Sequence, residues 1–318
     1  MIIDNLISRE KKPAHGLLAF EWVAIGYLLI TLLMMAIVWD KLVSPAEMLK
    51  GRAQFLLVTL ACWAVYYLWP SRLMMFVRVL VQMAFLGWWY PDTYELNRSL
   101  PNLDHLFAGW EQSLFGCQPS LLFSQKVPYG WFSELMCLGY VSYFPLMLIT
   151  YLYYFFKRYQ EFQMTAFVML ASFFAYYVIF ILLPVTGPQF YYLAVGTEKI
   201  AAGIFPNLGD WFLTHSERMA APGWSEGLFY HLLDLTHDAG ERPTAAFPSS
   251  HVGVTTVVVL LALRTRSKGL VLTILPFYLL MCLSTVYIYA HYAIDALAGL
   301  ITGITAYFVF LRLYPVKN

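Results

Sequence analysis

The sequence contains few charged residues. Lys, Arg, Asp and Glu make up only 12% of the 318 residues, whereas hydrophobic residues make up 60%. Soluble domains carry about twice that charged fraction, so the composition excludes an ordinary soluble domain. It predicts an integral membrane protein instead, and the aromatic content of 18% suits the interfacial belts of such a protein.

The chain also lacks a strong net charge and any cysteine pattern typical of a metal site. Its formal net charge is +1, which gives no reason to expect nucleic acid as a partner. The four cysteines include no Cys-x-x-Cys pair, so we interpret them as small side chains of an apolar environment. We therefore expect no metal and no cofactor.

Long apolar runs predict an all-α fold, a polytopic membrane helical bundle of about eight transmembrane helices. The second and third spans form a hairpin, and the third contains Arg78. For this arginine, a structural partner or an interfacial position is favoured over a functional role. The predicted spans are residues 18–39, 54–69, 72–90, 131–156, 163–183, 251–264, 269–288 and 291–313.

Two long connections divide the predicted bundle. We expect residues 1–90 to form N-terminal transmembrane helices and residues 91–318 to form a second membrane domain with long loops at 91–130 and 184–250. Within these loops, residues 103–110 predict a short interfacial helix. Residues 225–238 predict a surface helix with Ser225 as its N-cap.

Basic residues in short loops predict the topology. Lys157 and Arg158 form one such loop, and residues 264–268 contain three more basic residues. The positive-inside rule makes these loops cytoplasmic. Both long connections then lie on the extracytoplasmic face, which is periplasmic in a bacterium and lumenal in a eukaryote.

Two polar segments near the C-terminus interrupt strongly apolar sequence. Residues 247–251 read Phe-Pro-Ser-Ser-His, and residues 291–295 read His-Tyr-Ala-Ile-Asp. About 40 residues separate the two histidines, which is enough for two helices that each cross a bilayer once. We therefore expect His251 and His291 at the same extracytoplasmic membrane face.

The second segment places His291 four residues before Asp295. On a helix these residues share a face, so the carboxylate would accept the Nδ1–H of the imidazole. That contact would fix the tautomer and leave Nε2 with a free lone pair. Such a histidine can act as a base, a nucleophile or a metal ligand, and a purely structural helix start is the alternative.

The first segment predicts a helix start that binds an anion. Ser249 or Ser250 can act as N-cap, and the free N–H groups of the first turn attract negative charge. His251 in that turn can protonate a leaving oxygen. Together the two segments supply a nucleophile, an orienting carboxylate, an acid and an anion site. These are the requirements of phosphoryl transfer through a covalent phosphohistidine.

The two segments resemble signatures of the type 2 phosphatidic acid phosphatase superfamily. Residues 284–299 resemble its third signature, and residues 247–251 are similar to its second. The resemblance implies a six-helix core in the bundle and a catalytic membrane domain in residues 91–318. It also implies that His291 is the nucleophile, that Asp295 orients it and that His251 is the acid.

Two departures from the family pattern concern cations. Leu235 stands where the first signature has a lysine, and Thr285 stands where the third has an arginine. These losses resemble the inositol phosphorylceramide synthase branch, an inositolphosphotransferase group that moves phospho-headgroups between lipids. Residues 183–189 resemble a proline-rich turn of that branch.

The resemblance implies a lipid phosphotransferase acting on a phospholipid or lipid phosphate, with a lipid phosphate phosphatase acting on phosphomonoesters as the alternative. Arg242 is the preferred replacement cation, because a guanidinium grips a phosphate through two hydrogen bonds. Lys199, Arg218 and His237 are further candidates. Gln189 and Glu134 are candidate headgroup ligands, each with a structural role as the alternative.

Two other classes stay open from the sequence. A non-enzymatic lipid-binding protein or transporter fits eight spans with buried polar residues, although transport sites usually lie near the bilayer midplane. A metal site made of His251, His291 and Asp295 lacks a further ligand nearby in the sequence.

Overall fold

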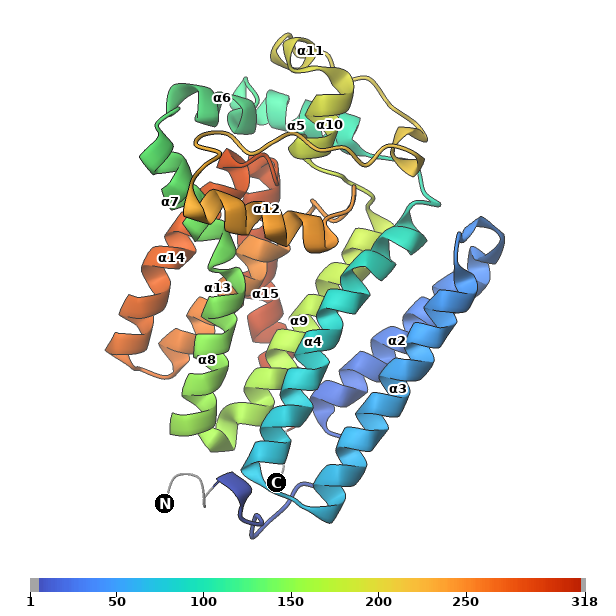
Figure 1. The fold of residues 1–318 in the computed structure, drawn as a ribbon, viewed down its shortest axis with the longest axis vertical. Coiled ribbons are helices and arrows are strands. Elements are labelled where there is room, and N and C mark those ends of the chain that lie inside the picture. Colours follow the sequence, from blue (N-terminus) through green and yellow to red (C-terminus); the bar gives the residue numbers. More distant parts are fainter. Residues whose placement is uncertain (1–5, 316–318) are drawn as a thin grey trace.

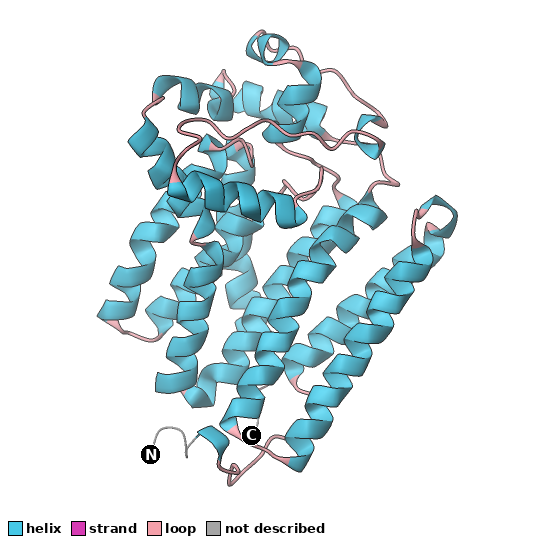
Figure 2. Ribbon diagram, viewed as in Figure 1, coloured by secondary structure: helices cyan, strands magenta, loops and turns pink. Residues whose placement is uncertain are grey.

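The computed structural model describes residues 6–315 of the chain. This part of the protein is helical and contains no β-strand (Figure 2), so the predicted all-α membrane bundle is confirmed. Long helices stand side by side, and shorter helices gather at the end opposite the two described chain ends (Figure 1). The long helices are α2 (Ala19–Ile37), α3 (Pro45–Leu68), α4 (Arg72–Asn97), α7 (Gly130–Val141), α8 (Tyr143–Lys157), α9 (Phe162–Leu182), α13 (Ser250–Arg264), α14 (Lys268–Tyr287) and α15 (Ala293–Leu313).

The long connections fold into a helical layer at that end. We call this the covering layer, and it contains helices at the two places where the sequence predicts them, residues 103–110 and 225–238. The layer consists of α5 (Asp104–Phe115), α6 (Pro119–Lys126), α10 (Pro188–Val195), α11 (Thr197–Ala201) and α12 (Leu228–Gly240). Three short 3-10 helices complete the fold: Trp39–Lys41, Tyr159–Glu161 and Trp211–Leu213.

Each predicted span corresponds to a helix or a helix pair. Six helices are long and apolar enough to cross a membrane. The span predicted at 131–156 is a bent pair, because α7 and α8 meet at 45°. The span predicted at 251–264 is α13, which has only 15 residues. It is therefore shorter than the roughly 20 residues that a bilayer requires.

The second span begins earlier and the third ends later than hydropathy indicated. α3 starts at Pro45, and α4 continues through Pro91 to Asn97, so the expected boundary after residue 90 falls inside a helix. Arg52 on α3 donates to both carboxylate oxygens of Asp92 on α4, at 2.9 and 2.7 Å. Hydropathy counts each charged residue as unfavourable in a span, so it ends the predicted spans at these residues. In the structure the two charges pair, which allows both to be buried.

A second buried ion pair holds α2 against α4. Arg78 Nε donates to Glu21 Oε1 at 2.8 Å, and both side chains are fully buried. Glu21 is thus a structural partner of Arg78, the role that the sequence favours for this arginine.

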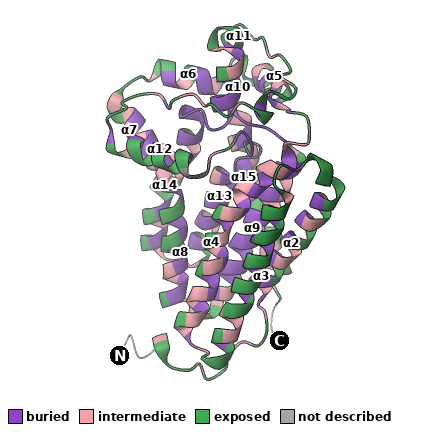
Figure 3. Ribbon diagram, turned by 45° about the vertical axis from the view of Figure 1, so that its right-hand side comes forward, coloured by how far each residue is buried: buried purple, intermediate pink, exposed green. Residues whose placement is uncertain are grey.

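The most buried long helix is α9, which packs against α2, α4, α13 and α15 and appears largely purple in Figure 3. The outer faces of α3 and α14 are exposed, as expected for surfaces against lipid.

Candidate active site

The two histidine segments meet beneath the covering layer. His251 lies in the first turn of α13, and His291 precedes α15. Their ring centroids are 5.7 Å apart, with an interplanar angle of 61°. The N–H of Ser249 donates to the carbonyl of Asp295 at 3.0 Å, which ties one helix start to the other. The hairpin of α13 and α14 thus brings the second histidine segment back beside the first.

The orientation of His291 differs from the sequence expectation. α15 begins at Ala293, so His291 and Asp295 do not share a helix face. Nδ1 of His291 lies 2.7 Å from the carbonyl oxygen of Ala246 and 3.6 Å from Asp295 Oδ2. Asp295 Oδ2 instead accepts from the N–H of Tyr292 at 2.9 Å, as a helix cap. The expected hydrogen bond from His291 to Asp295 is therefore wrong, because a backbone carbonyl is closer.

The carbonyl of Ala246 has the chemical effect expected of the carboxylate. A ring nitrogen facing a carbonyl must carry the proton, so Nε2 of His291 keeps its lone pair. Burial lowers the pKa of His291 to about 4, although the Ala246 carbonyl and the Glu241 carboxylate both oppose this shift. The imidazole is thus neutral near pH 7, which is the form that a nucleophile requires.

The start of α13 has the features of an anion site. Ser249 Oγ accepts from the N–H of Val252 at 3.3 Å, so Ser249 rather than Ser250 is the N-cap. Within the described part of the chain, the N–H groups of Ser250 and His251 form no hydrogen bond. Such free N–H groups at a helix start favour negative charge. Ser249 retains its O–H as a further donor, whereas its N–H already donates to the carbonyl of Asp295.

The candidate cation Arg242 lies at the surface. Its Nη1 donates to the backbone carbonyl of Glu241 at 2.9 Å, and the side chain is exposed. Among residues 6–315 it forms no ion pair. The guanidinium is thus not neutralised by a protein carboxylate, and its role toward phosphate stays a prediction.

Both candidate headgroup residues have protein partners. Glu134 accepts from the N–H groups of Phe229 and Tyr230, at 3.0 and 2.9 Å. It thereby caps α12, which begins at Leu228 with no side-chain bond from its own N-cap Gly227. The predicted Ser225 cap is wrong, and the structural alternative for Glu134 is the one observed.

Gln189 lies in the first turn of α10 and is buried. Its side-chain amide donates to Glu241 Oε1 at 2.9 Å. The carboxylate of Glu241 also acts on His291, since each group shifts the pKa of the other. The sequence analysis did not identify Glu241, because no motif or helical spacing marks this residue beside Arg242.

Two tyrosine rings enclose His251. The ring of Tyr140 stacks on the imidazole at 4.4 Å and 27°, and the ring of Tyr143 lies at 4.4 Å and 42°. Both tyrosines come from the bend between α7 and α8, so the bend positions them around the histidine. No motif or spacing in the sequence indicates that these tyrosines stack on His251.

Asp104 organises the backbone around His291. It is fully buried and accepts five hydrogen bonds, from the N–H and hydroxyl of Thr186, the N–H of Gly187, the amide of Asn102 and the hydroxyl of Tyr292. The left-handed Gly187, with φ of 89°, packs against the carbonyl of Ala290. Asp104 therefore connects α5, the turn before α10 and the residue next to His291.

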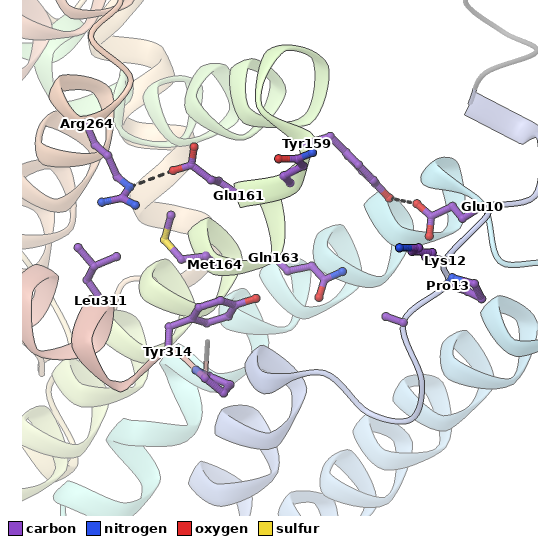
Figure 4. Close-up of a pocket in the computed structure, with 13 residues that line it drawn as sticks. Glu10, Lys12, Pro13, Tyr159, Glu161, Gln163, Met164, Arg264, Leu311 and Tyr314 are labelled. Atoms are coloured by element: carbon purple, nitrogen blue, oxygen red, sulfur yellow. Dashed lines mark hydrogen bonds and ion pairs between the residues drawn. The ribbon is translucent and has the colours of Figure 1, made fainter. Parts of the chain in front are cut away.

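A separate pocket of the described structure lies away from the two histidine segments. It has a volume of about 640 Å³ and is lined by Glu10, Tyr159, Glu161, Arg264 and Tyr314, among others (Figure 4). It shares no residue with the histidine cluster. Within residues 6–315, no group of three or more His, Cys, Asp or Glu side chains is placed to hold a metal ion.

One known family matches the region of the chain that contains the two histidine segments. No curated protein and no solved structure matches the chain significantly. Residues 105–309 match the family model described as the PAP2 superfamily. The matched region extends from α5 into α15 and contains both histidine segments, Arg242 and Gln189. Because the match covers more than half of the chain, this protein belongs to the PAP2 superfamily.

Proposed function

We propose that this protein is a membrane phosphotransferase that moves a phospho-headgroup between lipids through a phosphohistidine on His291. Membership of the superfamily supports a phosphatase or phosphotransferase type of function. The observation that carries the proposal is the neutral, tautomer-fixed His291, whose ring lies 5.7 Å from that of His251 at a helix start.

In the first step, Nε2 of His291 attacks the lipid phosphorus atom. The bond from phosphorus to the leaving oxygen breaks as His251, protonated in the complex with the anionic substrate, gives its proton to that oxygen and becomes neutral. The N–H groups of Ser250 and His251 hold the phosphoryl oxygens, and Arg242 supplies positive charge. In the second step, His251 takes the proton from an acceptor hydroxyl, whose oxygen attacks the phosphohistidine and releases His291.

The two missing cations favour transfer of a phosphodiester. Thr285 is buried beside the nucleophile, where its carbonyl accepts the N–H of His291 at 2.9 Å. A cation at this position would face the phosphate, but threonine supplies no charge. Leu235 is exposed on α12. A phosphodiester carries one negative charge fewer than a phosphomonoester dianion, so it requires fewer cations. This supports a reaction of the inositol phosphorylceramide synthase type at the extracytoplasmic face.

The test is an assay of the detergent-purified protein with two kinds of substrate. One reaction contains phosphatidic acid, and the other contains phosphatidylinositol with ceramide or diacylglycerol as acceptor. We expect a new phospholipid in the second reaction and its loss in the His291→Ala variant. The matched control is His231→Ala, which changes an exposed histidine on α12.

Two results would contradict the proposal. Inorganic phosphate release from phosphatidic acid, with no headgroup transfer, would make the protein a lipid phosphate phosphatase. Activity that persists in His291→Ala would remove His291 as the nucleophile.

A further inference from the structure

The short helix α12 carries three different rows of side chains along its length. It has 13 residues, so it is too short to cross a bilayer. Residues three, four and seven positions apart share one face of a helix, and each row follows this spacing. One row is buried, one is polar, and one is apolar but exposed. The buried row is Tyr230, Leu233 and His237, the polar row is His231, Asp234 and Asp238, and the leucine row is Leu228, Leu232 and Leu235.

The buried row holds α12 against the membrane span that α7 and α8 form together. α12 packs on α7 and also on α4, and it lies across the long helices in Figure 1. Glu134, in the second turn of α7, accepts the N–H of Tyr230 at 2.9 Å. Tyr140, near the end of α7, packs edge-on against the ring of His237 at 5.6 Å. Because these contacts extend along α7, α12 lies beside the span and not above its first residue.

The polar row belongs in water or among lipid headgroups. Asp234 and Asp238 form ion pairs with Arg218, at 3.3 and 3.0 Å, and Asp238 remains exposed. At 3.6 residues per turn, this row lies about a quarter of a turn from the leucine row. The charges therefore point along a different direction from the leucines, and they mark the side of α12 that faces away from hydrocarbon.

The leucine row lies on the side of α12 opposite the buried row. Leu228, Leu232 and Leu235 are 67%, 41% and 66% exposed. Exposed apolar side chains gathered on one face mark a surface that contacts another apolar phase. A helix with protein on one side, charges on the next and leucines opposite the protein has the arrangement of an interfacial membrane helix.

An exposed aromatic cluster marks the corner where α7 and α12 both begin. It contains Tyr129, Trp131 and Trp224. The N–H of Trp224 donates to Ser133 Oγ at 3.1 Å, and the side chain of Trp224 packs against Gly130, so the segment before α12 is fixed to the start of α7. Tryptophan and tyrosine are enriched at the level of the lipid headgroups. The cluster therefore fits the boundary between water and bilayer at this corner.

We infer that the leucine row of α12 docks on the acyl chains of the leaflet nearest the covering layer. Exposed Phe144 and Leu148 on α8 continue the apolar surface along the same span, so lipid that surrounds the span also reaches α12. The inference does not depend on the reaction at His291. The opposite face of α12 contacts Tyr140, whose ring stacks on His251. α12 therefore forms a wall between this leaflet and the histidine cluster.

The first experiment compares two neighbouring positions that belong to different rows. Leu232→Cys and His231→Cys are made in a full-length variant whose four native cysteines are alanine, and each is labelled with the fluorophore NBD in phosphatidylcholine vesicles. We expect nitroxides on the acyl chains to quench the label at Leu232→Cys, and aqueous iodide to quench it at His231→Cys. Equal iodide quenching at the two positions would overturn the inference. Protection of Leu232→Cys from both quenchers would also overturn it, because it would indicate a protein partner on the leucine row.

The second experiment keeps the native cysteines and measures melting temperatures in the same vesicles by tryptophan fluorescence. Leu232→Glu places a charge among acyl chains, whereas His231→Glu adds the same charge to the polar row. Leu232→Ala controls for contacts that Leu232 makes within the protein. We expect Leu232→Glu to melt below both other variants, because a charge in hydrocarbon is costly. Equal melting of Leu232→Glu and Leu232→Ala would contradict contact between the leucine row and lipid.

Discussion

Replacing Asp104 with asparagine tests how strongly its hydrogen bonds stabilise the structure around His291. One carboxylate oxygen of Asp104 accepts from Gly187 N–H at 2.9 Å and from Tyr292 hydroxyl at 3.0 Å. The other accepts from Asn102 and, through two bonds, from Thr186. Asparagine has one acceptor oxygen, so either orientation of its amide leaves a buried backbone N–H unpaired.

The expected loss in the free energy of unfolding follows from that unpaired N–H group. An unsatisfied buried donor costs about 1–3 kcal/mol. In a chain of this size each kcal/mol lowers the melting temperature by about 2–4 °C. We therefore expect Asp104→Asn to melt about 2–12 °C below the parent in detergent, as measured by tryptophan fluorescence. Lipid turnover should fall as well, because the Gly187 turn and Tyr292 flank His291, the proposed nucleophile.

Tyr292→Phe is the matched comparison for Asp104→Asn. It removes one hydroxyl donor and leaves both backbone N–H groups paired, so it should cost only about 0.5–1.5 kcal/mol. A melting temperature of Asp104→Asn within 1 °C of the parent would refute the reasoning. Equal losses in the two variants would show that the backbone donors are not what makes Asp104 important.

Three further predictions concern packing, pH and charge. Gly303→Ala should lower the free energy of unfolding by about 1–3 kcal/mol and reduce turnover, because the added Cβ would overlap the backbone of α13. Gly26→Ala is the control, since a Cβ at Gly26 meets open space, and equal melting curves of the two variants would contradict the prediction. Burial raises the pKa of Glu241 to about 7, so its negative charge appears as the pH rises and stabilises positive charge on His291. For the proposed lipid substrate, kcat/KM should therefore increase through about pH 7, and Glu241→Gln should lack this inflection. Arg78→Ala should cost about 3–5 kcal/mol by leaving Glu21 buried and unpaired, and an unchanged melting temperature would contradict this.

Hydropathy and two short motifs predicted the membrane helices and the helix start at His251. Apolar runs located the membrane helices because each run reflects burial in lipid or protein within one segment. Pro248, Ser249 and His251 indicated a capped helix start because capping is a local interaction, and the structure confirms Ser249 as the N-cap. The order and separation of the motifs indicated a superfamily to which the chain belongs.

Interactions between distant segments could not be predicted in the same way. The carbonyl that orients His291 belongs to Ala246, and a backbone carbonyl leaves no signal in a sequence. The cap of α12 comes from Glu134, far earlier in the chain, so Ser225 was the only candidate nearby. Glu241 required the packing of α12 before its electrostatic effect on His291 could be recognised.

The short α13 has a consequence for how a lipid reaches the site. A helix of 15 residues is about 22 Å long, whereas the hydrocarbon layer is about 30 Å thick. A helix of this length that starts at one boundary of the layer falls about 8 Å short of the opposite boundary. We expect a substrate to approach sideways from its own leaflet, keeping its acyl chains in the membrane while its phosphate reaches the sunken histidines.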